Sequence, residues 1–267
     1  MKLKIFDTKA SEKGSLEMPK QFNESFRPDL IKRAAVCVNS QLIQPYGAKS
    51  DAGMRASAEI SRRRHKYKGS YGYGISRVPR KILSHRGNRF SWVAAVAPGT
   101  VGGRKAHPPK AEKELCKDIN KKEKKKAMRC ALSAALMKDV VTDRGHRVSE
   151  NYPFVLSDEF ESVTKTSELL KSLKSLGLTE ELSRVSEKTI RAGKGKARGR
   201  KYKRKVGPMI IVSDDCPLSN VSNVPGLDVM KVEDISALDL APGMEPIRMA
   251  LFTEGAIKKI KEGNLFA

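Results

Sequence analysis

Long apolar runs are missing from this 267-residue sequence. The longest, Trp92 to Ala97, has six residues, whereas a membrane-spanning helix needs about 20. The first residues, Met1 to Lys9, alternate charged and apolar side chains, so we expect no signal peptide. The sequence therefore argues against a membrane-spanning helix.

Cysteine and histidine are scarce, and neither has the spacing of a metal site. The four cysteines are Cys37, Cys116, Cys130 and Cys216. Without a Cys-x-x-Cys pair, a zinc ribbon or a disulfide framework has little support, and we expect buried, reduced thiols in a cytosolic protein. The four histidines are His65, His85, His107 and His146. Their scatter, and the absence of a complete phosphate-loop or dinucleotide motif around residues 193–198, predict no metal and no cofactor.

Acidic residues are also few. The 30 Asp and Glu face 53 Lys and Arg, which gives a net charge of +23. A charge of this size repels itself within a fold and so indicates a polyanionic partner. Residues 47–110 carry 15 basic and two acidic groups, residues 191–208 carry nine and none, and residues 209–267 carry five and nine. The pattern is typical of a globular body with cationic extensions.

Outside the basic segments, short apolar runs alternate with helical patterns. Helical spacing predicts one helix that starts at Ser25 and another that starts at Asn120, where Glu123 fits a capping box. Strands are predicted at 154–156, 209–212, 227–230 and 248–252. Because strands and helices alternate, we expect a mainly parallel sheet with helices on both faces. The prediction is a single α/β domain over residues 1–267, with three layers.

Residues 47–110 are predicted to form a long basic arm inserted in this domain. They contain nine glycines and four prolines and have no sustained period, although residues 53–65 suggest a short helix. A loop this long is usually functional or disordered. Arginines and aromatic residues alternate with glycines, as in Tyr71-Gly-Tyr73-Gly, which suits phosphate contact and base stacking. We predict an arm that becomes ordered within folded RNA; simple disorder is the alternative.

Two smaller segments support this interpretation. The apolar patch from Trp92 to Val96 is expected to pack on the arm's own outgoing strand or on a partner protein. Residues 191–208 are expected to form a second phosphate-contacting loop, and a flexible linker is the alternative. Its basic run, Arg191 to Lys205, contains no acidic residue.

Four stretches of the sequence also resemble a known family. They are YGISRVPR at 73–80, APGTVGGRKAHPP at 97–109, INKKEKKKAMRCAL at 119–132 and RAGKGKARGRK at 191–201. In their order and spacing, the whole chain resembles the archaeal and eukaryotic branch of ribosomal protein four of the large subunit. In that family a glycine-rich run often follows the Pro-Arg pair, whereas Lys81 to Gly87 follows it here.

The resemblance implies a structural component of the cytoplasmic large ribosomal subunit, without catalysis. It implies a three-layer α/β body and an arm threaded into large-subunit ribosomal RNA, with its tip within Arg63 to Arg80 at the wall of the polypeptide exit tunnel. We expect neighbouring ribosomal proteins to contact the acidic residues 209–267, and we expect neither a membrane nor a small-molecule substrate as a partner. The predicted RNA-binding residues are Arg62, Arg63, Arg64, Lys66, Lys68, Tyr71, Tyr73, Arg77, Arg80, Lys81, Arg86, Arg89, Arg104, Lys105, His107, Lys194, Lys196, Arg198, Arg200, Lys201, Lys203 and Arg204.

The alternative function is a nucleic-acid-acting enzyme with an active site in the α/β body and a basic arm that guides the substrate. Its candidate residues are acidic and lie near the ends of predicted strands, at Asp158, Asp214 and Asp215. Ligand sites occur at that edge of a parallel sheet, although solvated turn residues are a commoner reason for such acids. No nucleophile–base–orienting set is apparent, so no catalytic residue is predicted.

Overall fold

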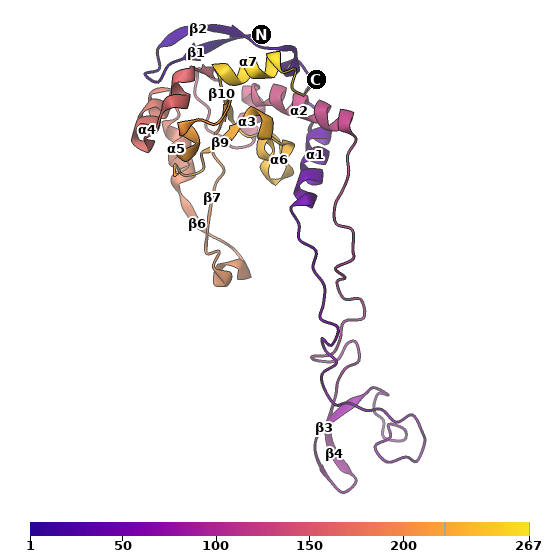
Figure 1. Ribbon diagram of the computed structural model, residues 1–267. Helices are drawn as coiled ribbons and strands as arrows, with labels where there is room; N and C mark the ends of the chain where they lie inside the picture. The colour runs from indigo at the N-terminus through magenta and orange to yellow at the C-terminus, as the bar shows by residue number, and fades with distance from the viewer. Residues whose placement is uncertain (222, 267) are drawn as a thin grey trace. The chain divides into compact units, whose positions relative to one another are not determined.

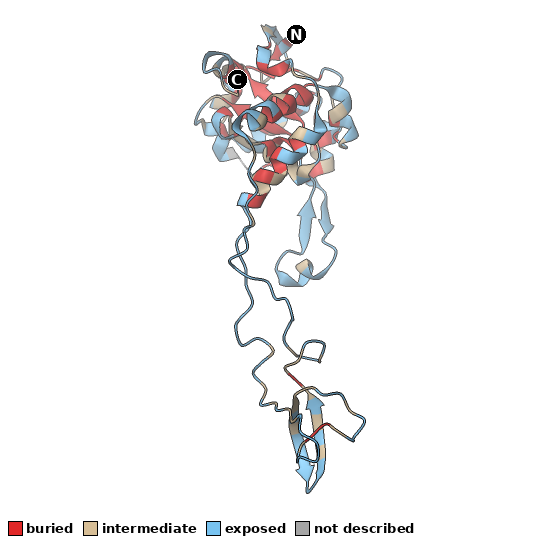
Figure 2. Cartoon of the chain, turned by 90° about the vertical axis from the view of Figure 1, so that its right-hand side faces the viewer, coloured by how far each residue is buried: buried red, intermediate tan, exposed pale blue. Residues whose placement is uncertain are grey.

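The computed structural model describes residues 1–221 and 223–266 and divides the chain into two compact units. The body consists of Met1–Leu42 and Cys116–Ala267, and the insertion is Ile43–Leu115. Among the described residues, Ala95 is the one buried hydrophobic residue of the insertion, whereas the body has a continuous core. Figure 2 shows the same contrast in burial.

The body is built on a six-stranded sheet with strand order β2-β1-β5-β10-β8-β9. Its strands are β1 (Lys2–Phe6), β2 (Glu12–Glu17), β5 (Val155–Leu156), β8 (Met209–Val212), β9 (Asp228–Lys231) and β10 (Ala250–Thr253). The pairing is parallel throughout except between β1 and β2, which are antiparallel. The predicted α/β fold with a mainly parallel sheet is therefore confirmed.

The two central strands β8 and β10 explain why the sheet is visible in the sequence. All four residues of each strand are buried. Because successive side chains of a strand point to opposite faces, four consecutive buried residues mean that both faces of the sheet are covered. Continuous apolar runs such as Met209–Val212 are typical of parallel strands in this position.

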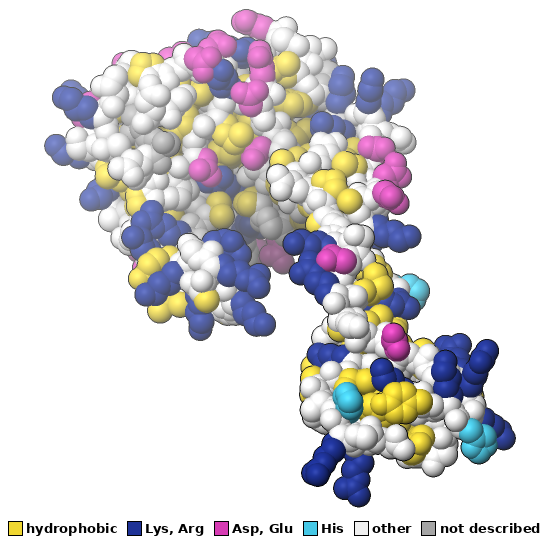
Figure 3. Space-filling view, turned by 60° about the horizontal axis from the view of Figure 1, so that its bottom comes forward, with side chains coloured by type: hydrophobic (Ala, Val, Ile, Leu, Met, Phe, Trp, Pro, Cys, Tyr) yellow, Lys and Arg dark blue, Asp and Glu magenta, His cyan; other side chains and the backbone are white. Residues whose placement is uncertain are grey.

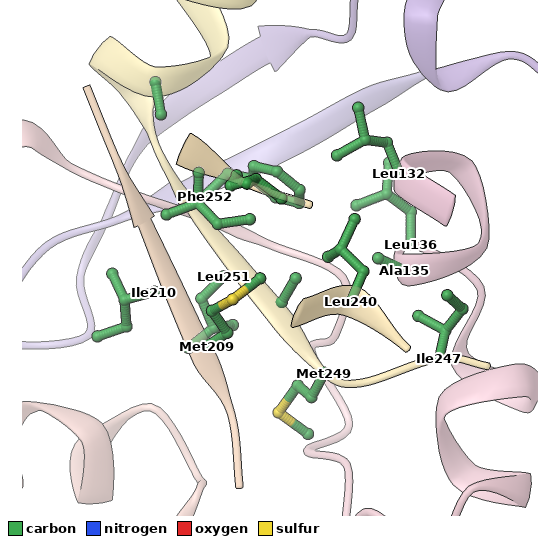
Figure 4. Close-up of a cluster of buried hydrophobic side chains, with 14 of the residues drawn as sticks. Leu132, Ala135, Leu136, Met209, Ile210, Leu240, Ile247, Met249, Leu251 and Phe252 are labelled. Atoms are coloured by element: carbon green, nitrogen blue, oxygen red, sulfur yellow. The ribbon is translucent and has the colours of Figure 1, made fainter. Parts of the chain in front are cut away.

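Seven α-helices are present in the described chain, and all of them belong to the body, as Figure 1 shows. They are α1 (Pro28–Gln41), α2 (Lys121–Ala135), α3 (Lys138–Asp143), α4 (Thr166–Ser175), α5 (Thr179–Ser186), α6 (Ala237–Leu240) and α7 (Glu254–Glu262). Helices α1, α2 and α6 pack on one another, and α7 packs on β8 and β10. In Figure 4, Leu132 of α2 and Leu240 of α6 lie near Phe252 and Leu251 of β10.

Two predicted helix starts differ from the structure in detail. Helix α1 begins at Pro28 with Arg27, not Ser25, at its N-cap, because proline is preorganised for the first helical position. Asn120 is the N-cap of α2, but its side chain makes no capping hydrogen bond. Glu123 instead forms an ion pair with Arg33 of α1, at 2.9 Å between Arg33 Nη1 and Glu123 Oε1. The capping-box interpretation is therefore wrong, and this glutamate joins two helices.

The antiparallel β1–β2 pair was not predicted as strands. Leu3, Ile5 and Phe6 of β1 are buried, and β2 is mostly exposed. The alternation of Lys2, Leu3, Lys4 and Ile5 is the period of a half-buried strand, so the signal was present in the sequence.

The four cysteines differ in their exposure to solvent. All four cysteines are free, and Cys37 and Cys130 are buried, but Cys116 is exposed and Cys216 is half-buried. The expectation of four buried thiols was wrong for Cys116 and Cys216.

Within the described ranges, every helix is too short or too polar to cross a membrane.

A close backbone approach in the body requires glycine at position 226. Gly226 has a φ of +69°, and a Cβ there would lie 2.0 Å from Cγ1 of Val185. Its carbonyl accepts hydrogen bonds from the amide of Gly207 and from Nη2 of the buried Arg248, at 3.0 and 3.1 Å. A side chain at position 226 would therefore strain the backbone and disturb the hydrogen bonds that the Gly226 carbonyl accepts from Gly207 and Arg248.

We expect Gly226→Ala to lower the free energy of unfolding by about 2 kcal/mol, because it adds steric overlap to an unfavourable φ. Gly243→Ala is the matched control, since Gly243 has a φ of +78° but a Cβ there would meet no atom within 4 Å. The control should lose about 1 kcal/mol from backbone strain alone. Urea denaturation measures both free energies of unfolding. If Gly226→Ala and Gly243→Ala lower this free energy equally, steric overlap with Val185 does not contribute.

Candidate nucleic-acid interface

The two limbs of the insertion lie side by side near its base. The amide of Ala48 donates to the carbonyl of Pro109 at 3.1 Å. Further along, Gly53 has a φ of +78°, and a Cβ there would lie 2.4 Å from the amide nitrogen of Arg104. This close approach leaves no room for a side chain at Gly53. Residues 53–65 contain no helix, so that prediction was wrong; a left-handed glycine in contact with the returning limb is unsuited to a helix start.

A two-stranded antiparallel sheet gives the insertion regular structure. It consists of β3 (Arg80–Arg86) and β4 (Arg89–Ala94), with Ile82 opposite Trp92 and His85 opposite Phe90. The two-residue loop begins with Gly87 at a φ of +55°, and glycine at this position favours a tight hairpin. The apolar patch of 92–96 thus pairs with the preceding strand, one of the two arrangements expected from the sequence.

Aromatic rings cluster on one side of this hairpin. The rings of Phe90 and Trp92 stack with their centroids 5.3 Å apart, and Tyr67 meets Phe90 edge-on at the same distance. The guanidinium of Arg80 lies 5.4 Å from the centre of the Trp92 ring. Such contacts contribute roughly 0.5–1.5 kcal/mol each, so a few of them order the hairpin without a conventional core.

The predicted basic residues of the insertion point into solvent. They are all exposed apart from Lys68 and Arg80, which are half-buried. Among the described residues, no ion pair involves any of them; the insertion's acidic Asp51 pairs with Arg55, which was not in the predicted set. Of the two predicted tyrosines, Tyr73 is exposed and Tyr71 is half-buried, with the Arg77 guanidinium 5.3 Å from the Tyr71 ring centre. His107 is also exposed.

The second basic segment of the sequence forms a hairpin of its own. Strands β6 (Lys188–Ile190) and β7 (Tyr202–Arg204) pair, and a 3₁₀ turn connects them. The ammonium groups of Lys188 and Lys201 lie 5.9 and 5.4 Å from the centre of the Tyr202 ring. All seven predicted cations of this basic hairpin (residues 188–204) are exposed. Figure 3 shows dark-blue side chains gathered on it.

A buried ion network, which the sequence did not reveal, anchors the basic hairpin. The carboxylate of Glu181 is fully buried and bonds to Nδ1 of His146 at 2.7 Å and to the Arg184 guanidinium at 2.6 and 2.8 Å. Arg184 also donates to the carbonyl of Val206, just after β7, at 2.7 Å. Burial raises the pKa of Glu181, but hydrogen bonds from Arg184, His146 and the Arg147 amide outweigh it and lower that pKa to about 2.

The acids proposed for an enzyme are engaged in structural contacts. Asp214 pairs with Lys259 and Asp215 with Lys231, each at 2.6 Å, and Asp158 accepts a hydrogen bond from the amide of Gly255. They lie at the carboxyl ends of β8 and β5, as the sequence predicted. In the parts of the chain that the structure describes, no group of three or more potential metal ligands comes together.

Comparisons with known proteins add a family match over nearly the whole chain. Residues 16–263 match the model of the "Ribosomal protein L4/L1 family". The chain is 44% identical over 268 residues to a protein of Nanoarchaeum equitans, with all of both chains covered. It is 38% identical to one of Halobacterium salinarum over 98% of this chain and all of the relative. It is 40% identical to one of Methanococcus maripaludis, over 97% of this chain and 98% of the relative. Each of the three is called "Large ribosomal subunit protein uL4".

Proposed function

The chain belongs to the ribosomal protein L4/L1 family, and from this we propose that it binds large-subunit ribosomal RNA through two basic elements. Family membership makes it a structural protein of the large ribosomal subunit and not an enzyme. The two elements are the arm, residues 47–110, and the second basic loop, residues 191–208. The alternative of a nucleic-acid-acting enzyme is therefore set aside.

The observation that carries this proposal is a dense set of cations, nearly all exposed, that mostly have no acidic partner. Cations that stabilise a fold are normally paired with carboxylates, whereas in the described parts of residues 47–110 and 191–208 only Arg55 and Lys205 form ion pairs. Each such group releases a counterion from RNA when it contacts a phosphate, and this release drives binding. Exposed tyrosine rings among the cations add surfaces on which bases can stack.

The arm is proposed to reach the wall of the polypeptide exit tunnel. Two limbs of about 30 residues, at ~3.3 Å per residue, have a maximum reach of roughly 100 Å, which suits a segment threaded deep into RNA. The family resemblance of residues 73–80 and 97–109 supports this placement, with the tip within Arg63 to Arg80.

Residues 209–267 are proposed to contact neighbouring basic ribosomal proteins. This section carries nine acidic and five basic residues, so it repels RNA and attracts cationic protein segments. Several of its acids pair within the body, as Asp228 does with Arg248 and Glu233 with Lys259. These pairs use the section's own cations and leave its net negative charge unchanged.

The arm's role in RNA binding can be tested with a triple substitution of Arg62, Arg63 and Arg64 to Gln. If all three contact phosphates, the slope of log affinity against log salt should fall by about 2 to 3, and affinity at 0.2 M salt by about 50-fold. A filter-binding titration on large-subunit ribosomal RNA measures both quantities.

A matched control removes the same charge from the body. Lys165, Lys171 and Lys174 of the α4 region are exposed, and their replacement by Gln should leave the salt slope nearly unchanged. Equal losses in the two triple variants would contradict a specific role of the arm, because net charge alone would then explain the binding.

A further inference from the structure

A pocket in the insertion lies against the aromatic cluster of the hairpin. It has a volume of about 400 Å³, and its walls include Glu59, Ser61, Tyr67, Arg80, Ile82 and Trp92. This volume falls within the ~300–1,000 Å³ of typical ligand sites. The walls come from residues 57–61, from residues 66–68 and from the β3–β4 hairpin. Two backbone hydrogen bonds between Glu59 and Arg80, at 3.1 and 3.3 Å, join the first of these segments to the hairpin.

The chemistry of the walls matches a flat, heteroaromatic ligand with polar edges. Trp92 and Tyr67 supply rings, and Ile82 supplies an apolar surface. Arg80 is a hydrogen-bond donor and Glu59 an acceptor; neither forms an ion pair with another described residue. The Ser61 hydroxyl oxygen is buried and has no hydrogen-bond partner in the described structure, a state that costs about 1–3 kcal/mol unless a ligand satisfies it.

The surroundings of the pocket are cationic. Lys66 and Lys68 also line it, and Arg62, Arg63 and Arg64 precede them in the chain. Figure 3 shows hydrophobic side chains of the insertion surrounded by Lys, Arg and His side chains. A ring-lined pocket within a field that attracts phosphates suits a base that is attached to a phosphodiester chain, and not an apolar protein side chain.

We propose that this pocket holds one unstacked RNA base, with Tyr67 providing the stacking surface, Trp92 an aromatic wall beside the base and Ser61 a hydrogen bond to the base edge. The inference rests on the proposed RNA binding and adds base recognition to phosphate contact. RNA-binding proteins commonly recognise bases that are splayed out of a helix in this way.

The single tryptophan of the chain makes the pocket observable, because Trp92 alone accounts for indole fluorescence. The probes are a six-nucleotide adenylate RNA and an abasic ribose-phosphate chain of the same length and charge. Both should bind the full-length protein through their phosphates. Only the adenylate should quench Trp92, and it should bind about tenfold more tightly.

Two tyrosine variants provide the matched comparison. Tyr67→Ala should reduce adenylate affinity to that of the abasic chain, whereas Tyr46→Ala should leave it unchanged, because Tyr46 is exposed, lies outside residues 47–110 and does not line the pocket. Tyr67→Phe keeps the ring and should retain the tight binding. An unchanged Trp92 emission maximum in the free variants verifies that the hairpin is intact.

The outcomes separate this inference from the proposed function. If the two RNA chains bind equally and with the same salt dependence, or if Tyr67→Ala behaves like Tyr46→Ala, base recognition is refuted while phosphate-driven RNA binding stands. If neither chain nor ribosomal RNA binds at low salt, the proposed function fails as well.

Discussion

Replacing residues 43–115 with a short Gly-Ser linker is expected to leave the body folded and to lower affinity for large-subunit ribosomal RNA by about a thousandfold or more at 0.2 M salt. The two ends of the body at which the linker would be attached lie close together. The amide of Lys117 donates to Ser40 Oγ at 2.9 Å, and Cys37 Sγ donates to the Lys117 carbonyl at 2.8 Å. The linker therefore joins two points that the body already holds together.

The body should not depend on the insertion for its stability. Of the buried hydrophobic residues, all but Ala95 lie outside 43–115 in the described chain. The apolar area that stabilises the body is thus retained in the linker variant. The insertion, by contrast, carries the larger of the two concentrations of positive charge, and the salt slope should fall by about 0.7–0.9 for every phosphate that the variant no longer neutralises.

The measurements are urea denaturation of the two proteins and a salt titration of RNA binding. A control variant with the second basic loop intact and an uncharged insertion of native length distinguishes the effect of charge from that of altered connectivity; it should bind as weakly as the linker variant. If the linker variant unfolds, the body depends on the insertion for stability. If the linker variant keeps native affinity, the insertion does not supply the RNA binding proposed for it.

Much of the body could be predicted because its signals are local. Met209–Val212 is buried on both faces, so a continuous apolar run was enough to identify β8. Strand β5 has two residues, Val155 and Leu156, and was found because Phe154 extends its apolar run. Thr253 is the N-cap of α7, and its hydroxyl accepts a hydrogen bond from the Ala256 amide, so the start of this helix is also set by a local contact.

The contacts within the candidate site could be predicted only in part. Charge density identified the exposed cations, because their exposure requires no knowledge of the fold. The pocket depends on strand register: a bulge between Ile82 and Ser84 brings His85 opposite Phe90 on the face that also carries Trp92. Tyr67 reaches that face from a separate loop, and no pattern in the sequence marks Ser61 or Glu59 as its neighbours.

Long-range ion pairs were equally hidden. Glu123 has the spacing of a capping box, yet its partner is Arg33, which lies 90 positions earlier in the chain and comes next to it only when α1 and α2 pack. His146 and Glu181 are likewise brought together by the fold. Sequence spacing predicts contacts within one helix, whereas contacts between elements require the tertiary structure.

Glu181→Gln is expected to lower the free energy of unfolding by about 3 kcal/mol at pH 6. The substitution keeps the shape of the side chain but removes the charge that Arg184 and His146 face at a fully buried site, and breaking a buried ion pair from one side costs about 3–5 kcal/mol. Glu180→Gln is the control on the same helix, because Glu180 is exposed and its replacement should change stability by less than about 0.5 kcal/mol.

The dependence of this loss on pH identifies the charge of Glu181 as its cause. The pKa of Glu181 is lowered from 4.5 to about 2 in the folded protein. Its ionised form therefore contributes fully above pH 4.5, and the contribution, about 3 kcal/mol for a shift of this size, disappears as the pH falls toward 2. The difference between wild type and Glu181→Gln should shrink over the same interval in denaturation series from pH 6 to pH 2.5. A difference that stays constant with pH would mean that packing, and not the buried carboxylate, holds the base of the basic hairpin.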